Sequence, residues 1–352
     1  MANSSAKTTH RNSATRAAKA AARAAPANRS APAPATPVGV IGLGIMGSAM
    51  SANLVKAGFK VFGYDPVAKA GMRLKKAGGT SCDSAMQVAR QSRLIVLSLP
   101  SEAALDDACA ALMAGAAKGT VVAETSTLPE AAKLRAQALL AGVGITLLDC
   151  PLSGTGAQAL TRDLAVYASG DAGGIKQFAP VFEGFARARY DVGAFGNGMR
   201  MKLVANLLVA IHNLSTAEAL ALGARSGLDP AMVVKVVADG AGGSRMFQVR
   251  GPMMVDRSWD KATMKVSTWQ KDMRLIGDLL EATATAAPLF ATCIPIYNAA
   301  MALGHGADDT AAVYSVLEHM MGASYKPGKQ AGKANAEAKA KATSKSKVRK
   351  TA

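Results

Sequence analysis

The chain has 352 residues, which is enough for two domains, and half of them are hydrophobic while only 5% are aromatic. Its formal net charge is +17, from 41 basic and 24 acidic residues, but fifteen of the basic residues and only one of the acidic residues lie in residues 1–37 and 326–352. Residues 38–325 are therefore nearly neutral, which argues against a groove that neutralises many phosphates.

The apolar runs and the cysteines narrow the class of protein further. The most apolar stretch, Leu203 to Leu222, is interrupted by polar and charged side chains, so we expect no membrane span. The four cysteines are scattered without a Cys-x-x-Cys pair, and no secretory signal is recognisable, which predicts free thiols in a reducing compartment. No histidine has ligand spacing to a cysteine or another histidine, so we expect no metal site.

The two ends have a composition of their own. Residues 1–37 and 326–352 are rich in Ala, Ser, Lys and Arg and have little to bury, which predicts disordered basic tails. We expect a cytoplasmic protein, although the first tail also has the composition of a mitochondrial transit peptide, which would place the protein in the matrix. Contact with nucleic acid is expected through these tails only.

The first ordered elements form a recognisable unit. A β-branched run at 38–41 predicts a strand, GLGIMG follows at 42–47, an apolar stripe at 48–57 predicts a helix, and 60–65 predicts a second strand. In that context a G-x-G-x-x-G sequence indicates a dinucleotide-binding fold. The residues predicted to bind the cofactor in this unit are Gly42, Gly44, Ile45, Met46, Gly47 and Asp65.

Each residue of this motif has a physical reason. Gly42 permits the tight turn, Gly44 lets the backbone approach a pyrophosphate, and Gly47 lets the helix pack close to the strand. The helix N-terminus supplies N–H donors to the phosphates. Asp65 follows Gly44 by 21 residues, where its carboxylate can accept hydrogen bonds from ribose hydroxyls and would repel a 2′-phosphate. Because no Arg follows Asp65 directly, we predict NAD, with NADP less favoured.

Three further buried runs, at 94–99, 120–124 and 145–149, alternate with helical stretches. This alternation predicts a mostly parallel, doubly wound α/β sheet of the Rossmann type. Ligands of such sheets lie beyond the carboxyl ends of the strands. The residues that leave these ends and should surround the nicotinamide are Leu99, Pro100, Thr127, Ser153 and Gly154.

After Asp191 the strand pattern stops, which predicts a cofactor-binding domain over 38–198 followed by an all-α domain over 199–325. A long helix should run to about residue 225, with Leu203, Leu207, Ile211 and Leu214 as a buried stripe. Lys202 and Asn206 are one turn apart on one face, where they could hold an oxygen-bearing substrate. Spacing alone nevertheless favours an exposed lysine beside an amide.

The opening segment, GVIGLGIMGSAMSANLVKAGFKVFGYD, resembles the β-hydroxyacid dehydrogenase family, which includes 3-hydroxyisobutyrate dehydrogenase and tartronate semialdehyde reductase. The likeness continues in order through DCPLSG at 149–154, KLVAN at 202–206 and KDMRL at 271–275, and it spans roughly residues 38–322.

The resemblance implies an NAD(P)-dependent dehydrogenase acting on CH–OH groups, which interconverts a small β-hydroxy acid and its semialdehyde or ketone by hydride transfer. It implies that Lys202 is the general acid/base and that Asn206 binds the substrate. Ser153 and the amides after it would hold the substrate carboxylate. Lys271 would close over the cofactor and substrate from the helical domain. The Ala- and Met-rich helical half is compatible with a homo-oligomer, a dimer or a tetramer.

Two departures from the family pattern affect the substrate. The chain has Ser153-Gly154-Thr155 where the family usually has Ser-Gly-Gly, and Arg162-Asp163 where it usually has a glycine. Thr155 either contacts a substrate hydroxyl or is an ordinary loop residue, and Arg162 should add a charge near the site. The open substrates are 3-hydroxyisobutyrate, glycerate or tartronate semialdehyde, and sugar acids such as threonate. A phosphorylated sugar acid is disfavoured because no arginine cluster is evident near the loop.

Two other functions compete with this interpretation. A non-catalytic cofactor-binding protein with nucleic-acid-binding tails would not need both Lys202 and Asn206, and an imine reductase on the same scaffold typically lacks the catalytic lysine. Further along, Asp308-Asp309-Thr310 predicts a solvated helix start.

Overall fold

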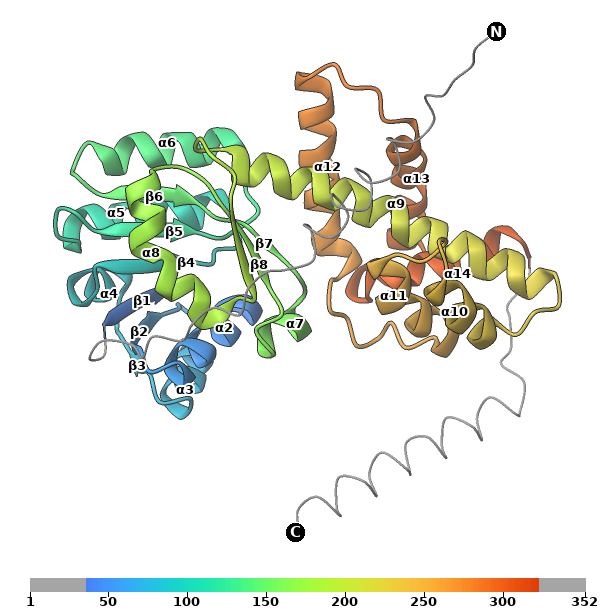
Figure 1. The fold of residues 1–352 in the computed structure, drawn as a ribbon, viewed down its shortest axis with the longest axis horizontal. Helices are drawn as coiled ribbons and strands as arrows, with labels where there is room; N and C mark the ends of the chain where they lie inside the picture. Colours follow the sequence, from blue (N-terminus) through green and yellow to red (C-terminus); the bar gives the residue numbers. More distant parts are fainter. Residues whose placement is uncertain (1–35, 323–352) are drawn as a thin grey trace, which may run out of the picture. The chain divides into compact units, whose positions relative to one another are not determined.

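The structure, a computed structural model, describes residues 36–322. The predictions for the basic tails therefore fall outside the described residues, apart from Thr36 and Pro37. Within the described range the sheet part extends to Asp191 and the helical part begins at Asn197 (Figure 1).

A parallel six-stranded sheet forms the first part, in the order β3-β2-β1-β4-β5-β6. Its strands are β1 (Pro37–Ile41), β2 (Lys60–Tyr64), β3 (Thr80–Ser81), β4 (Leu94–Leu97), β5 (Val121–Glu124) and β6 (Thr146–Asp149). The predicted doubly wound fold is confirmed, and the five predicted strands lie within one or two residues of their expected bounds. The two-residue strand β3 is too short to leave a pattern in the sequence.

Helices cover both faces of this sheet (Figure 1). They are α2 (Ile45–Lys56), α3 (Ala68–Lys76), α4 (Ala85–Gln91), α5 (Glu102–Gly115), α6 (Glu130–Ala141) and α8 (Ala172–Phe185). Alternate residues of β1 enter two different cores, because successive side chains of a strand point to opposite faces. Val38 and Val40 pack with α2 and α8, whereas Ile41 packs with α4, α5 and α6.

A small second sheet, which no pattern in the sequence predicted, follows β6. Its order is β7 (Leu152–Ser153), β8 (Ala165–Ala168) and β9 (Ala188–Asp191), with β7 antiparallel and β9 parallel to β8. The short helix α7 (Gly156–Leu160) lies between β7 and β8 in the chain. An isolated bridge between Asp149 and Ser169 links this sheet to the end of β6.

The second part is built around α9 (Asn197–Arg225), a helix of 29 residues. It packs against α10 (Pro230–Asp239), α11 (Arg245–Asp256), α12 (Val266–Ala282), α13 (Pro288–Ala302) and α14 (Val313–Met320). Two 3₁₀ turns, η1 (His305–Ala307) and η2 (Thr310–Ala312), precede α14. Of the predicted stripe, Leu203 and Leu214 are buried, while Leu207 and Ile211 are partly buried against the same core.

Among the described helices, α9 is the one that is long and apolar enough to cross a membrane by length and composition. Its surroundings give another reason for that composition. Five helices surround it, and it buries the polar side chains Asn206, Asn213 and Thr216. These are the properties of the central helix of a packed domain.

Candidate active site

The glycine turn after β1 combines tight packing with one open position. Gly42 has a φ of +89°, and a Cβ there would lie 2.2 Å from the Ser98 carbonyl oxygen. A Cβ on Gly47 would lie 1.9 Å from the Gly42 carbonyl oxygen. A Cβ on Gly44, by contrast, would meet nothing within 4 Å. The first two glycines are therefore required by the protein's own packing, whereas Gly44 leaves space open beside its backbone.

This open position lies where a dinucleotide pyrophosphate would need it. Gly44 is the N-cap of α2 and makes no side-chain capping hydrogen bond, so no side chain of the cap competes for the N–H groups of the first turn. Ile45 in that turn is 73% exposed, and Met46 is half-buried. The residues present therefore fit a dinucleotide.

The neighbouring strand ends complete this edge of the sheet. Just past β2, the Asp65 carboxylate accepts hydrogen bonds from the backbone N–H groups of Leu43 at 2.7 Å and Val67 at 2.8 Å. Leu99 and Pro100 follow β4, which is paired with β1, and Leu99 N donates to Ser126 Oγ at 2.7 Å. The strand order reverses between β1 and β4, which is where ligands bind in open α/β sheets.

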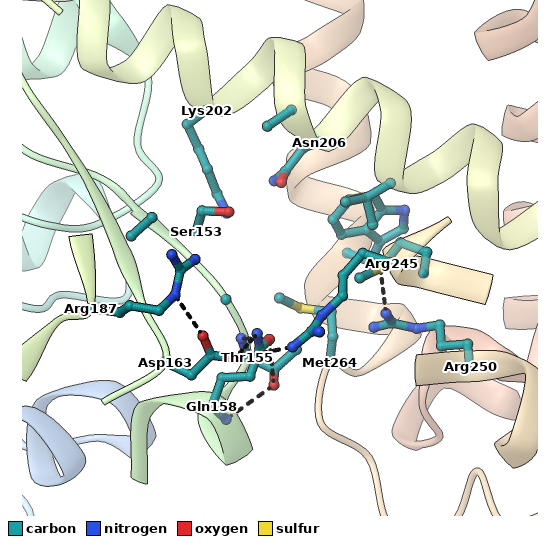
Figure 2. Close-up of a pocket in the computed structure, with 16 residues that line it drawn as sticks. Ser153, Thr155, Gln158, Asp163, Arg187, Lys202, Asn206, Arg245, Arg250 and Met264 are labelled. Carbon is teal, nitrogen blue, oxygen red and sulfur yellow. Dashed lines mark hydrogen bonds and ion pairs between the residues drawn. The ribbon is translucent and has the colours of Figure 1, made fainter. Parts of the chain in front are cut away.

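A cavity of about 390 Å³ lies beside the small sheet and α9. All five predicted substrate-binding residues line it together (Figure 2), namely Ser153, Gly154, Thr155, Lys202 and Asn206. Of the residues predicted to bind the cofactor or to surround the nicotinamide, Ser153 and Gly154 line this cavity. The others lie on the edge of the large sheet, except for Lys271, which lies on α12.

Lys202 is partly buried, and its side chain points toward Ser153 in Figure 2. Burial lowers the pKa of Lys202, and this effect exceeds the opposing effect of the Asp272 carboxylate. Lys271, a second cation nearby, lowers the pKa of Lys202 further. Among residues 36–322, no hydrogen bond or ion pair engages the Lys202 ammonium, so it is available to a ligand. The exposed lysine that spacing alone favoured is not what the structure contains.

A chain of polar contacts connects Asn206 to the large sheet. Asn206 Nδ2 donates to Asp272 Oδ2 at 2.9 Å, and Lys271 Nζ lies 2.9 Å from Asp272 Oδ1. Lys271 Nζ also donates to the backbone carbonyl of Thr127, which follows β5. One N–H of the Asn206 amide is thereby held by Asp272, and α12 is tied to the carboxyl end of the sheet.

The start of α9 is anchored to buried charge. Asp149 Oδ2 accepts a hydrogen bond from Met199 N at 2.7 Å, one turn before Lys202. The other oxygen, Asp149 Oδ1, lies 2.7 Å from Lys133 Nζ, which is also 2.7 Å from Glu124 Oε2, and the three charged side chains are fully buried. Burial alone would lower the pKa of Lys133, but Glu124 and Asp149 together raise it, so Lys133 stays charged.

The loop after β7 is shaped by Thr155. Thr155 Oγ1 accepts a hydrogen bond from Gln158 N, and Thr155 N donates to Gln158 Oε1 at 3.0 Å, which forms a capping box at the start of α7. Thr155 is therefore a helix cap that also lines the cavity. Because the Thr155 N–H group already donates to Gln158, it is not available to the substrate carboxylate that the amides after Ser153 were expected to hold. The backbone around Gly154, which has a φ of +135°, is left for that role.

Three arginines line the same cavity, so the expectation of no arginine cluster near the loop is wrong. They are Arg187, Arg245 and Arg250. They come from the segment before β9 and from α11, so the fold alone brings them to the loop, and no local sequence signal could have revealed them. Arg162 is not in the cavity, because it donates to the Glu183 carbonyl instead.

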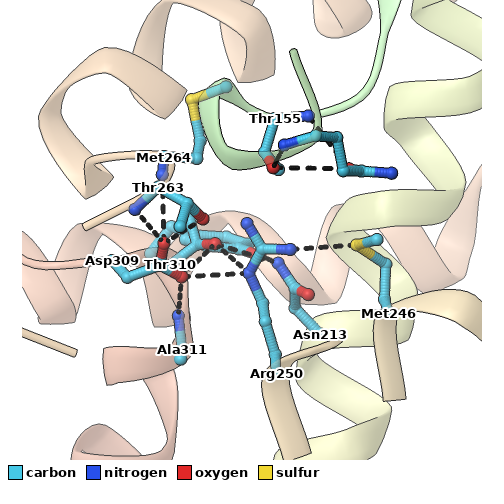
Figure 3. Close-up of polar contacts among 11 residues, drawn as sticks. Thr155, Asn213, Met246, Arg250, Thr263, Met264, Asp309, Thr310 and Ala311 are labelled. Carbon is cyan, nitrogen blue, oxygen red and sulfur yellow. Dashed lines mark hydrogen bonds and ion pairs between the residues drawn. The ribbon is translucent and has the colours of Figure 1, made fainter. Parts of the chain in front are cut away.

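The start of η2 also differs from its expectation. Asp309 caps this turn as predicted, accepting a hydrogen bond from Ala311 N, but it is fully buried rather than solvated. The reason is an ion pair with Arg250 Nε at 3.1 Å (Figure 3).

A glycine turn at the switch point of a doubly wound sheet, beside a cavity that holds a free lysine, a serine and an amide, defines a dinucleotide-dependent oxidoreductase. Comparison with known proteins supports this class. Residues 37–195 match the family model described as the NAD-binding domain of 6-phosphogluconate dehydrogenase, and residues 196–317 match that described as NAD-binding of NADP-dependent 3-hydroxyisobutyrate dehydrogenase.

Two relatives and one solved structure extend this likeness. L-threonate dehydrogenase of Escherichia coli K12 is 32% identical over 287 residues, which is 80% of this chain and 94% of that protein. 3-Hydroxyisobutyrate dehydrogenase of Pseudomonas aeruginosa is 35% identical over 62% of this chain and 74% of that protein. The structure of Mycobacterium tuberculosis 3-hydroxyisobutyrate dehydrogenase with L-serine has a TM-score of 0.73 and 28% identity, covering 80% of this chain and 99% of that one. The chain belongs to the β-hydroxyacid dehydrogenase family.

Proposed function

We propose that this enzyme interconverts a small β-hydroxy acid and its semialdehyde or ketone, with NAD as the hydride carrier and Lys202 as the general acid/base. The observation that carries the proposal is the unpaired Lys202 ammonium, which lines one cavity with Ser153 and Asn206. A bound nicotinamide ring supplies or accepts the hydride at the carbinol carbon.

The residues of the chain account for the rest of the reaction. In oxidation, neutral Lys202 takes the hydroxyl proton, and in reduction its ammonium returns a proton to the carbonyl oxygen. Asp272 holds one N–H of the Asn206 amide, which leaves the carbonyl oxygen and the second N–H to orient the substrate hydroxyl. Ser153 and the backbone around Gly154 hold the carboxylate.

NAD is the proposed cofactor because of Asp65. Its carboxylate stands just past β2, where ribose hydroxyls can donate to it and where a 2′-phosphate would be repelled. A kcat/KM at least tenfold higher with NADP would overturn this preference.

L-Threonate is a specific candidate substrate, because the chain matches L-threonate dehydrogenase along 94% of that protein. Oxidation of L-threonate, 3-hydroxyisobutyrate and glycerate should be followed by the absorbance of the reduced cofactor. Turnover of at least one of them supports the proposal. Normal cofactor binding with no turnover of any hydroxy acid would instead identify a non-catalytic cofactor-binding protein.

We also propose that the protein is a homo-oligomer. Four apolar side chains in the segment from the end of α9 to α10 are more than half exposed, and such surfaces favour association. They are Leu222, Leu228, Met232 and Val236. Light scattering should give a mass of at least two chains, and a single-chain mass would contradict the proposal.

A further inference from the structure

The cavity carries more positive charge than one substrate carboxylate requires. Its lining includes four cations and a single carboxylate, Asp163. In Figure 2, Lys202 and Ser153 lie at one side of the group, and Arg245 and Arg250 lie at the other. The proposed chemistry uses the first side only, which leaves the arginine side without an assigned role.

Arg250 is the unusual member of this group. Its side chain is only 2% exposed, and its guanidinium is incompletely bonded. Nε donates to Asp309 Oδ1 at 3.1 Å and to Thr310 Oγ1 at 2.7 Å, and Nη1 contacts Met246 Sδ at 3.0 Å. Nη2 makes no hydrogen bond within residues 36–322. In Figure 3 this nitrogen points to the side of Thr155, which also lines the cavity.

Asp309 and Thr310 hold Arg250 through its Nε and leave Nη2 unused. Asp309 accepts hydrogen bonds from Thr263 N and Oγ1, both at 2.8 Å, and from Met264 N at 3.0 Å. Burial raises the pKa of Asp309, but Arg250 and these hydrogen bonds outweigh it and lower that pKa. Asp309 is therefore a well-satisfied carboxylate that binds only one edge of the guanidinium. Because Arg250 lines the cavity, the N–H groups of the guanidinium that Asp309 and Thr310 leave unused can donate to an anion bound there.

Arg245 adds a second charge near the same position. It is the first residue of α11, five positions before Arg250, and its Nη2 is 3.1 Å from Asp163 Oδ2. Asp163 Oδ1 is already paired with Arg187 Nε at 2.9 Å. The single carboxylate of Asp163 thus pairs with the guanidinium groups of both Arg187 and Arg245, so these three side chains together keep a net positive charge.

We propose that Arg250, assisted by Arg245, forms a second anion subsite, and that the enzyme prefers hydroxy acids with another anionic group, a carboxylate or a phosphate, at the far end of the carbon chain over monocarboxylates such as L-threonate. This inference rests on the proposed function for the placement of the first carboxylate at Ser153. Arginine suits the role because its planar guanidinium matches the geometry of both anions.

Non-reacting probes test the subsite directly by titration calorimetry on the full chain. Valerate and glutarate have the same number of carbon atoms but one and two carboxylates, and 3-phosphonopropionate carries a phosphonate in place of the second carboxylate. We expect glutarate or 3-phosphonopropionate to bind about tenfold more tightly than valerate. The tighter of the two identifies the preferred anion. Equal affinity for all three probes would overturn the proposal.

Single-residue variants test whether the preference for dianions depends on Arg250. Arg250→Gln should abolish the preference for dianions and leave valerate binding unchanged. Arg274→Gln is the matched control, because Arg274 is exposed on α12 and does not line the cavity. If Arg250→Gln unfolds, Arg245→Gln replaces it, because Arg245 is 64% exposed and its substitution should only reduce the preference. An unchanged preference in the folded variant contradicts the subsite.

These experiments can contradict the proposed function and the second anion subsite independently of each other. Binding of glutarate needs no turnover, so a dianion preference without oxidation of any hydroxy acid supports the subsite and contradicts the proposed function. Turnover of L-threonate without a dianion preference supports the proposed function and contradicts the subsite.

Discussion

Lys202 must lose its proton before it can accept one from a hydroxy acid, and its burial makes that loss easier. Because the pKa of Lys202 is lowered, kcat/KM for oxidation should rise with pH and level off below the ordinary lysine pKa of about 10.4. Reduction needs the ammonium form, so its kcat/KM should fall over the same pH range. Profiles measured in both directions check this, and two profiles that move in the same direction would contradict the role.

We expect Asp65 and Arg73 together to govern the choice between NAD and NADP. Arg73 Nη2 donates to the Leu43 carbonyl at 3.1 Å, and Leu43 N donates to Asp65, so the two charged groups meet at the glycine turn. Asp65→Asn removes the repulsion of a 2′-phosphate and leaves Arg73 in place. The ratio of kcat/KM for NADP to that for NAD should rise about tenfold, or about 1.4 kcal/mol.

The double variant with Arg73→Gln is the control for this prediction. It should lose most of the gain, because no guanidinium then remains near the phosphate position. A ratio that Asp65→Asn leaves unchanged would mean that Asp65 does not select the cofactor.

Helix α9 carries Lys202, and its position depends on a buried ion cluster at the ends of β5 and β6. Lys133→Met would leave Glu124 and Asp149 as buried carboxylates without a counter-ion. We expect a loss of about 3–5 kcal/mol in the free energy of unfolding, measured with denaturant. Lys75→Met, on the exposed side of α3, is the matched control and should change stability by less than about 0.5 kcal/mol. An equal effect of both substitutions would contradict a stabilising cluster.

The elements of the sheet were predictable because buried parallel strands are continuous apolar runs. Strands such as β4 and β5 therefore appear in the sequence at nearly their true bounds. Only some of the residues that line the substrate cavity could be predicted from the sequence. Lys202 and Asn206 are one helical turn apart, but Arg250 reaches Asp309 across 59 positions of the chain. Contacts of that kind depend on the packing of α11 beside η2, which no local pattern encodes.

At the scale of the whole molecule, Lys271 connects the helical part to the sheet. It donates to the Thr127 carbonyl and pairs with Asp272, which in turn holds Asn206. Lys271→Met should weaken cofactor binding about tenfold, because a charge-assisted contact beside the nicotinamide end is lost. Quenching of protein fluorescence by NAD measures this, with Arg274→Gln on the same helix as the control. Unchanged NAD affinity would contradict a role for Lys271 in holding the cofactor.

The proposed reaction depends on Lys202 as the proton-transferring group. The most direct measurement is the kcat of Lys202→Ala with the best hydroxy acid found, compared with Lys235→Ala, which removes an exposed lysine of α10. We predict that Lys202→Ala lowers kcat by about 10²–10⁴-fold while NAD affinity and thermal stability stay near those of the unmodified protein. A folded Lys202→Ala protein with the kcat of the Lys235→Ala control would contradict the mechanism.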